Sequence, residues 1–135
     1  MKIKLIDYGY TQAPSRKHYN DAGVDVYIQK DVRLSPHAVT KIPLGFGIEV
    51  PDGYAGYVFP RSSLAAQGLV CELPPIDSGY RGEINAIVSN VTDDVAELQA
   101  GERVGQLVIM PVIIADYVTN TGEERKTGAF GSTGR

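Results

Sequence analysis

Apolar residues recur at every second position in short stretches of this chain, and glycines and prolines interrupt the stretches throughout. Val24, Val26 and Ile28, for example, alternate with Asp25 and Tyr27, and a period of two is typical of a β-strand. The 15 glycines and 8 prolines are spread over 135 residues rather than clustered. Glycines and prolines distributed in this way favour many strands joined by turns over a disordered segment. No segment shows a helical period of useful length. The sequence therefore predicts an all-β sandwich, barrel or jelly roll.

The alternation also predicts where the strands lie. We expect a first strand with one solvated face, built on Met1, Ile3 and Leu5, and polar connections at residues 8–20 and 92–101. Further strands are expected at residues 21–28, 39–50 (strand, bend, strand), 54–59, 84–88 and 104–117, with Pro111 marking a break or a sheet edge. One helical turn is expected at residues 62–67, capped by Ser62 or Ser63 and ended by Gly68.

Composition limits the classes of function. A chain of 135 residues with a formal net charge of −3 predicts one domain without a broad basic surface for nucleic acid. The single cysteine, Cys71, excludes an internal disulfide framework and a cysteine-based zinc site. No signal peptide and no apolar run of membrane-spanning length is present. We therefore expect a cytoplasmic protein that does not bind membranes.

The segment PPIDSGYRGEI, residues 74–84, concentrates chemically useful side chains. It places Asp77, Tyr80 and Arg81 within five positions. The preceding prolines fix φ and remove backbone donors, while Gly82 relaxes the backbone. These features favour a tight loop or hairpin that aims a carboxylate. An ordinary surface turn is the alternative interpretation, because Asp, Ser and Gly are common in turns.

Two further segments combine cationic or hydroxyl side chains with backbone that suits an anion. The tail, residues 125–134, carries Arg125, Lys126, glycines, two hydroxyls and Phe130, a composition that suits an anionic ligand with a ring. A frayed terminus is the alternative, and the tail is not a Walker A loop. Arg61 with two serines starts the expected helical turn; a plain helix cap is the alternative there.

Five stretches, in this order, together resemble the five motifs of the trimeric dUTP nucleotidohydrolases, the dUTPases. They are DAGVDVYI (21–28), PRSSLA (60–65), IDSGYRGEI (76–84), GERVGQLVI (101–109) and RKTGAFGSTG (125–134). The resemblance covers essentially the whole chain, and its third and fifth motifs are the most specific. It implies a dUTPase-like jelly roll or β-barrel over residues 1–135, with residues 119–135 as a mobile lid. It also implies a homotrimer with active sites at subunit interfaces.

The resemblance further implies an Mg²⁺-dependent hydrolysis of dUTP to dUMP and pyrophosphate. Asp77 would be the general base for a water that attacks the α-phosphorus in line, and Tyr80 would pack on the deoxyribose. Asp25 would bind Mg²⁺ through a water. The remaining expected substrate-binding residues are Arg61, Ser62, Ser63, Ile76 and Gln106 in the body of the chain, and Arg125, Phe130, Gly131, Ser132 and Thr133 in the tail.

This chain departs from the family pattern mainly near the expected uracil pocket. Pro75 stands where a small residue is usual, residues 66–75 are about one position short, and Cys71 falls near a position often held by Asn. Asn85 replaces a common Lys, and the fifth motif has Lys126 and Ala129 where Gly is frequent. These departures indicate a divergent subgroup of phage or prophage type. The alternative functions are a dCTP deaminase, a non-catalytic regulatory nucleotide binder and a structural or sugar-binding β-sandwich.

Overall fold

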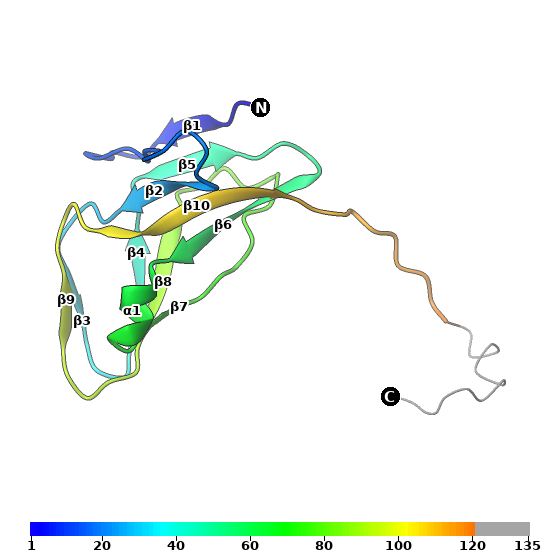
Figure 1. Ribbon diagram of the computed structural model, residues 1–135. Coiled ribbons are helices and arrows are strands. Elements are labelled where there is room, and N and C mark those ends of the chain that lie inside the picture. The colour runs from blue at the N-terminus through cyan, green and yellow to red at the C-terminus, as the bar shows by residue number, and fades with distance from the viewer. Residues whose placement is uncertain (121–135) are drawn as a thin grey trace.

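The computed structural model describes residues 1–120, which form ten strands and one short helix (Figure 1). The helix α1 spans Ser62–Ala66. The strands are β1 (Lys4–Asp7), β2 (Gly23–Tyr27), β3 (Val32–Leu34), β4 (Val39–Pro43), β5 (Phe46–Glu49), β6 (Tyr54–Pro60), β7 (Leu69–Cys71), β8 (Asn85–Asn90), β9 (Ala96–Leu98) and β10 (Arg103–Pro111). The predicted all-β class is confirmed, and the arrangement is that of a jelly roll rather than a closed barrel.

Two three-stranded antiparallel sheets form the body of the fold. Their strand orders are β2-β10-β6 and β4-β8-β7, and the pairs β1-β5 and β3-β9 complete the structure. Inward residues of both sheets join one apolar core, which includes Val26 and Leu107 from the first sheet and Ile42 and Val88 from the second. The period-two alternation seen in the sequence supplies these inward residues.

Several sequence predictions need correction. Met1 and Leu5 are 76% and 41% exposed, so the first strand does not bury the face that alternation suggested; Ile3 alone of the three packs against the core. The strands β3, β7 and β9 were missed because each has only three residues, too few for an alternation to show. Neither serine caps α1, since Arg61 occupies the N-cap position and makes no side-chain capping bond.

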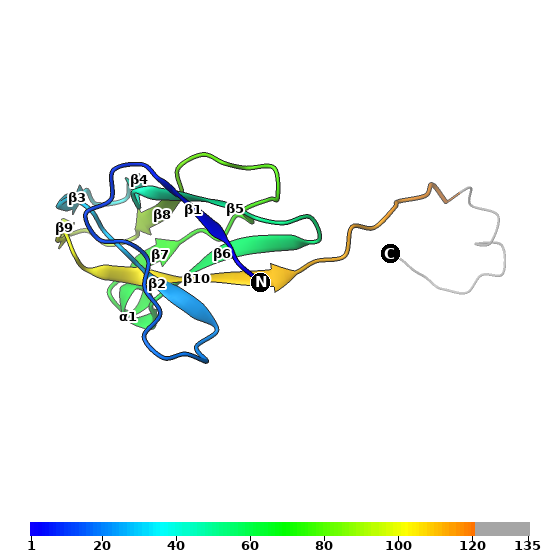
Figure 2. The same ribbon diagram turned by 90° about the horizontal axis from the view of Figure 1, so that it is seen from above.

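The prediction that Pro111 lies at a sheet edge is confirmed, but the strand expected to run on to residue 117 is wrong, because β10 ends at Pro111 and no strand follows within residues 112–120. The pairing of β10 with β2 stops at Val108, whereas its pairing with β6 continues to Pro111. Pro111 therefore lies where one side of β10 has no neighbour, and its missing N–H costs no ladder bond. Beyond it, Val112 N–H donates to Gly53 O at 2.9 Å, and residues 113–120 then leave the body as an extended arm (Figures 1 and 2). Among the described residues, no helix is long and apolar enough to cross a membrane.

Candidate functional site

One group of predicted site residues lies on the paired strands β2 and β10. Asp25 and Gln106 are direct cross-strand partners in this antiparallel pair. Arg103, near the start of β10, places its Nη1 atom 3.4 Å from Asp25 Oδ1. The Asp25 side chain stays 21% exposed, so its second oxygen can reach solvent or a hydrated ligand. We call Asp25, Arg103 and Gln106 the sheet group.

Arg61 lies at the end of β6, one residue beyond the Pro60–Gly105 pair of β6 and β10. Its Nη2 atom is 2.9 Å from Glu102 Oε2, and its Nη1 donates to Ser63 Oγ at 2.8 Å. Its Nε atom is buried and has no hydrogen-bond partner among the described residues. The guanidinium is thus already partly engaged and held in place, while Ser62 is exposed.

A second group of predicted residues surrounds a cavity of about 240 Å³ between β8 and the segment that precedes it. Ile76, Asp77 and Tyr80 all line this cavity, as does Cys71. Burial raises the pKa of the Cys71 thiol, so it packs here as a neutral side chain. We call Ile76, Asp77 and Tyr80 the loop group.

The turn that carries Asp77 is closed by its own backbone. Tyr80 N–H donates to Asp77 O at 3.0 Å, and Ile76 and Gly56 exchange two backbone hydrogen bonds of 2.7 and 2.9 Å. The Tyr80 hydroxyl donates to Glu83 O at 2.7 Å. The ring covers Gly82 so closely that a Cβ there would lie 2.6 Å from the Tyr80 hydroxyl oxygen. The predicted tight loop is therefore confirmed, and its glycine is explained by this contact.

Glu83 fastens the same loop to the rest of the fold. Its carboxylate accepts the Gly45 N–H at 2.9 Å, at the bend between β4 and β5. Its carbonyl accepts hydrogen bonds from both Tyr80 and Asn85. Outside the cavity, the Tyr8 hydroxyl donates to Arg81 O at 2.7 Å, and Arg81 pairs with Glu49 at 2.6 Å. Each of these contacts restricts how far the Asp77 turn can move.

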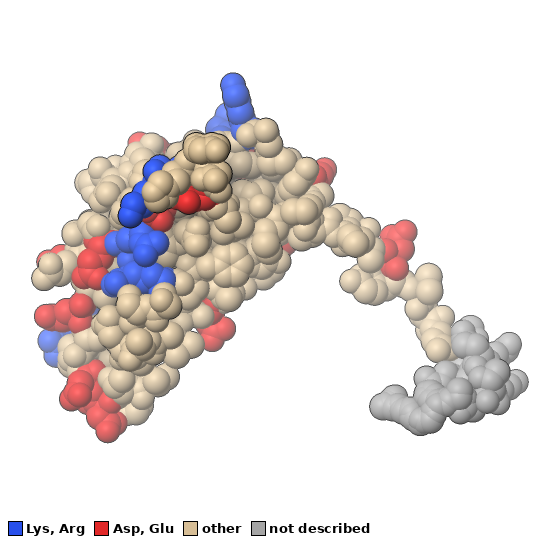
Figure 3. Space-filling view, viewed as in Figure 1, with Lys and Arg blue, Asp and Glu red and all other residues tan. Residues whose placement is uncertain are grey.

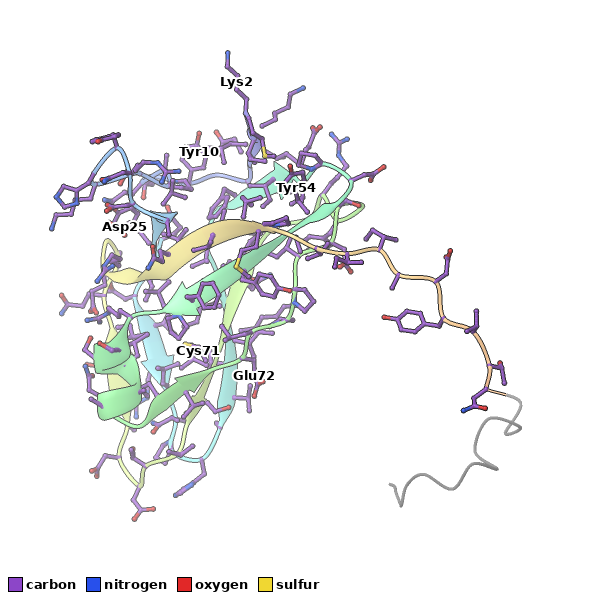
Figure 4. All side chains as sticks on the ribbon, turned by 45° about the vertical axis from the view of Figure 1, so that its right-hand side comes forward. Lys2, Tyr10, Asp25, Tyr54, Cys71 and Glu72 are labelled. Atoms are coloured by element: carbon purple, nitrogen blue, oxygen red, sulfur yellow. The ribbon has the colours of Figure 1, made fainter. Side chains whose placement is uncertain are left out.

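The sheet group and the loop group do not meet within one chain. Ile76 bonds to Gly56 on the outer side of β6, whereas Asp25 lies on β2, and β10 separates the two strands. Asp25 pairs with Gln106, and Gln106 pairs with Phe59, which lies three residues from Gly56 along β6. Adding this offset to the strand spacings from Asp25 through β10 and β6 to Ile76 puts the Cα atoms of Asp25 and Ile76 about 17 Å apart. Figure 4 shows Asp25 and Cys71 on opposite sides of β10 and β6.

Charge is distributed unevenly around these residues. In Figure 3 the basic side chains of the visible face gather near the N-terminus and over β2, while acidic side chains lie mostly at the β3-β9 end. At β2, Arg16 donates to the carbonyls of Asp21 and Gly23. The His18 backbone N–H donates to the Asp21 carboxylate and lowers its pKa.

No three His, Cys, Asp or Glu side chains within residues 1–120 cluster as a metal site.

Sequence reasoning missed the residues that hold the site in place. Glu102, Arg103 and Glu83 contact Arg61, Asp25 and the loop, respectively. All three lie inside the quoted motifs, so membership of a motif was the available signal. The predicted tail residues Arg125, Phe130, Gly131, Ser132 and Thr133 lie outside the described residues.

Comparisons with known proteins agree with this arrangement. The family model described as dUTPase matches residues 9–134. This chain belongs to the dUTPase family. It is 40% identical to a deoxyuridine 5'-triphosphate nucleotidohydrolase of Tropheryma whipplei strain Twist, over 97% of this chain and 93% of that protein. It is also 43% identical to the protein of the same name from Cutibacterium acnes, over 84% of this chain and 80% of that protein. The predicted enzyme class, dUTP diphosphatase, is thereby confirmed.

Solved dUTPase structures share the fold. The dUTPase of Staphylococcus bacteriophage 80alpha superposes with a TM-score of 0.81 over 89% of this chain and 96% of that chain, at 23% identity. A dUTPase from phage phi11 of S. aureus, described with a structural Mg(II) ion, superposes with a TM-score of 0.80 over 90% of this chain and 97% of that chain, at 22% identity. Identities this low establish the fold alone, so a phage-type origin stays a prediction.

Proposed function

We propose that this chain hydrolyses dUTP to dUMP and pyrophosphate, which lowers dUTP and supplies dUMP for dTMP synthesis. The observation that carries the proposal is that Asp77 and Tyr80 line one cavity, on a turn closed by backbone hydrogen bonds. The named relatives and the family match support the same reaction. A cytoplasmic location is part of the proposal, and cell fractionation checks it.

Asp77 acts as the general base. Its carboxylate takes a proton from a water molecule, whose oxygen attacks the α-phosphorus in line. The bond from the α-phosphorus to its bridging oxygen breaks, and pyrophosphate leaves. Asp77 is exposed at the mouth of the cavity, where a water and a phosphate can both reach it. Tyr80 packs on the deoxyribose, where its ring leaves no room for a 2′-hydroxyl, and Ile76 supports the base.

The phosphates extend toward the sheet group. Arg61, Ser62, Ser63 and Gln106 contact them, and Arg61 is pre-oriented for this by Glu102. The tail closes over the bound nucleotide: Arg125, Gly131, Ser132 and Thr133 hold the outer phosphates and Phe130 covers the uracil. In this proposal residues 1–135 form one domain, with residues 119–135 as its lid.

Asp25 fits the role of a residue that holds hydrated Mg²⁺. The ion keeps several waters and takes few protein ligands in nucleotide sites, so a single partly exposed carboxylate beside Gln106 suits it. When bound, Mg²⁺ would gather the triphosphate oxygens and neutralise charge on the leaving pyrophosphate.

A homotrimer completes the site. A separation of about 17 Å between Asp25 and Ile76 is too long for both groups of one chain to act on the same α-phosphate, so the sheet group of a neighbouring subunit has to face each cavity. The arm also exposes Ile113, Ile114, Tyr117 and Val118, and such apolar surface favours cover by a partner subunit. Light scattering coupled to size exclusion checks the predicted threefold mass.

Pyrophosphate release with Mg²⁺ and dUTP, dTTP or UTP tests the function. We expect release from dUTP, none from UTP because of Tyr80, and none from dTTP because its methyl group lacks space. Release from none of them, with no change on adding EDTA, would leave the regulatory nucleotide binder as the better description.

A further inference from the structure

The loop of residues 76–84 is anchored separately at its two ends. At the first end, Ile76 and Gly56 exchange two backbone hydrogen bonds of 2.7 and 2.9 Å. At the second end, Ile84 donates its N–H to Phe46 O at 2.8 Å, and its side chain is 3% exposed. The carboxylate proposed as the base follows the first anchor directly, whereas the aromatic ring of the loop lies nearer the second.

The Tyr80 ring takes its position from the second end of the loop. Its hydroxyl donates to Glu83 O at 2.7 Å, and a Cβ at Gly82 would lie 2.8 Å from its Cζ atom. The ring is therefore fixed at its tip by one carbonyl and lies directly against Gly82. The main chain of Tyr80 is held differently, because its N–H donates to Asp77 O at 3.0 Å. The peptide after Glu83 thus positions the ring more than it positions the Asp77 turn.

The Glu83 carbonyl points toward the ring because of how its peptide is bonded. The carbonyl and the N–H of a trans peptide point in opposite directions, and no cis peptide bond occurs in the described residues. The N–H of this peptide belongs to Ile84 and donates to Phe46 O, on β5. Any shift of Phe46 O therefore tilts the peptide and moves the acceptor that holds the Tyr80 hydroxyl.

The Glu83 carboxylate holds the bend that leads into Phe46. Its Oε2 atom accepts the N–H of Gly45, the preceding residue, at 2.9 Å. Gly45 is buried and has a φ of +81°. A Cβ there would lie 2.9 Å from Tyr10 Cβ, so the bend is also packed closely against the N-terminal segment. Since a buried N–H without an acceptor is unfavourable, loss of the carboxylate favours a displaced bend, and Phe46 O moves with it.

Glu83 lines the same cavity as Tyr80 and Asp77. We propose that Glu83 is a positioning residue for sugar discrimination: by holding Gly45, its carboxylate keeps the Tyr80 ring where the ring blocks a 2′-hydroxyl. This inference rests on the proposed function, in which Tyr80 packs on the deoxyribose. Because Asp77 depends on the other anchor, loss of the carboxylate should relax the choice between dUTP and UTP more than it slows the hydrolysis of dUTP.

The test compares the parent chain with Glu83→Ala. Pyrophosphate release with Mg²⁺ gives kcat/KM for dUTP and for UTP, and calorimetric titration with dUMP and UMP measures the same preference without turnover. We expect the dUTP/UTP ratio and the dUMP/UMP affinity ratio to fall about 10-fold, with kcat for dUTP little changed. Unchanged ratios with a lower melting temperature overturn the inference, because Glu83 would then only stabilise the fold. A parent chain that turns over neither nucleotide removes the proposed function itself.

Two more variants test whether Glu83 acts through the Tyr80 hydroxyl. Glu83→Gln keeps an oxygen that can accept the Gly45 N–H, so it should retain the ratios of the parent. Tyr80→Phe loses the bond to Glu83 O and should lower them. The double variant Glu83→Ala, Tyr80→Phe should lower them no further than the stronger single variant, because both changes release the same ring. Additive losses, or a glutamine variant that behaves like the alanine variant, count against the inference.

Glu49→Ala is the matched control. Its carboxylate also bonds to the loop, through Arg81 at 2.6 Å, but Arg81 is 65% exposed, and exposed ion pairs contribute little. This control should leave both ratios unchanged; a fall equal to that of Glu83→Ala would overturn the specific role of Glu83. If Glu83→Ala folds poorly, Glu83→Asp replaces it, because a side chain one methylene shorter does not reach Gly45 in the same position. Parent-like ratios in Glu83→Asp likewise contradict the inference.

Discussion

The sheet group and the loop group are positioned by different kinds of backbone structure. Asp25 and Gln106 face each other because two strands pair in one register, and a slip of one strand by one residue would turn one of the two side chains to the opposite face. Ile76, Asp77 and Tyr80 lie on an irregular segment held by a few separate contacts, to Gly56, Gly45 and Glu83. Departures from the family pattern fall mainly on this second segment, whose conformation depends on fewer neighbours.

The largest effect should come from the loop group. Asp77→Asn keeps the shape of the side chain but removes the base, and we expect kcat to fall by about 10²–10⁴-fold while nucleotide still binds. Steady-state kinetics and calorimetric titration measure the two quantities. Asp52→Asn, in the exposed turn after β5, is the control. A near-normal kcat for Asp77→Asn would remove Asp77 as the base.

The tail belongs to neither group, so deleting it tests whether the sheet group and the loop group are sufficient for catalysis. Deletion of residues 126–135 should leave a folded trimer, with kcat/KM lowered by about 100-fold through loss of substrate positioning. Circular dichroism and light scattering verify the fold and the assembly. If kcat/KM stayed unchanged, the two groups alone would complete the site and the lid would have no role.

For the sheet group, metal dependence is the sensitive measurement. Asp25→Asn preserves the pairing with Gln106 but removes the charge, and the Mg²⁺ concentration for half-maximal activity should rise about 10-fold or more. Asp31→Asn is the control, because an amide oxygen can still accept the Ala100 N–H that Asp31 accepts now. The same Mg²⁺ dependence in Asp25→Asn and in the parent chain would place the ion elsewhere.

The smallest effect should come from one hydroxyl of the loop group. Tyr80→Phe keeps the ring but loses the hydrogen bond to Glu83 O, so KM for dUTP should rise about 2- to 10-fold with little change in kcat. Tyr8→Phe removes a similar bond to Arg81 O from outside the cavity and serves as the comparison. Equal KM values for the two variants would mean that Tyr80 acts only by bracing the loop.

The regular parts of the fold were predictable because alternation reports burial directly. The strand through Val26 and the break at Pro111 followed from side-chain period and from the missing proline donor. The exposure of Met1 and Leu5 did not, since Met1 precedes β1 and the residues that the β1-β5 pair buries, Phe46 and Ile48, come from β5. The strands β3, β7 and β9 were too short for any period to show.

The candidate site was predictable in its residues but not in its arrangement. The motifs selected Asp25, Asp77 and Tyr80. Nothing in one sequence, however, indicates that two strands, β10 and β6, lie between Asp25 and Ile76. The Arg61–Glu102 pair also joins residues 41 positions apart, and only the pairing of β6 with β10 brings them together. Contacts of that kind depend on topology, which local patterns do not encode.

The central strand β10 connects the sheet group to the loop group through its hydrogen-bonded neighbours on both sides. It pairs with β2, which carries Asp25, and with β6, whose Gly56 holds Ile76. Gly105 permits this packing, because a Cβ there would lie 2.0 Å from Phe59 O. Amide hydrogens of β10 should therefore exchange only on global unfolding. Hydrogen exchange of β2 and of the Ile76–Gly56 bridge should slow together when nucleotide binds, even if the nucleotide contacts only one of them.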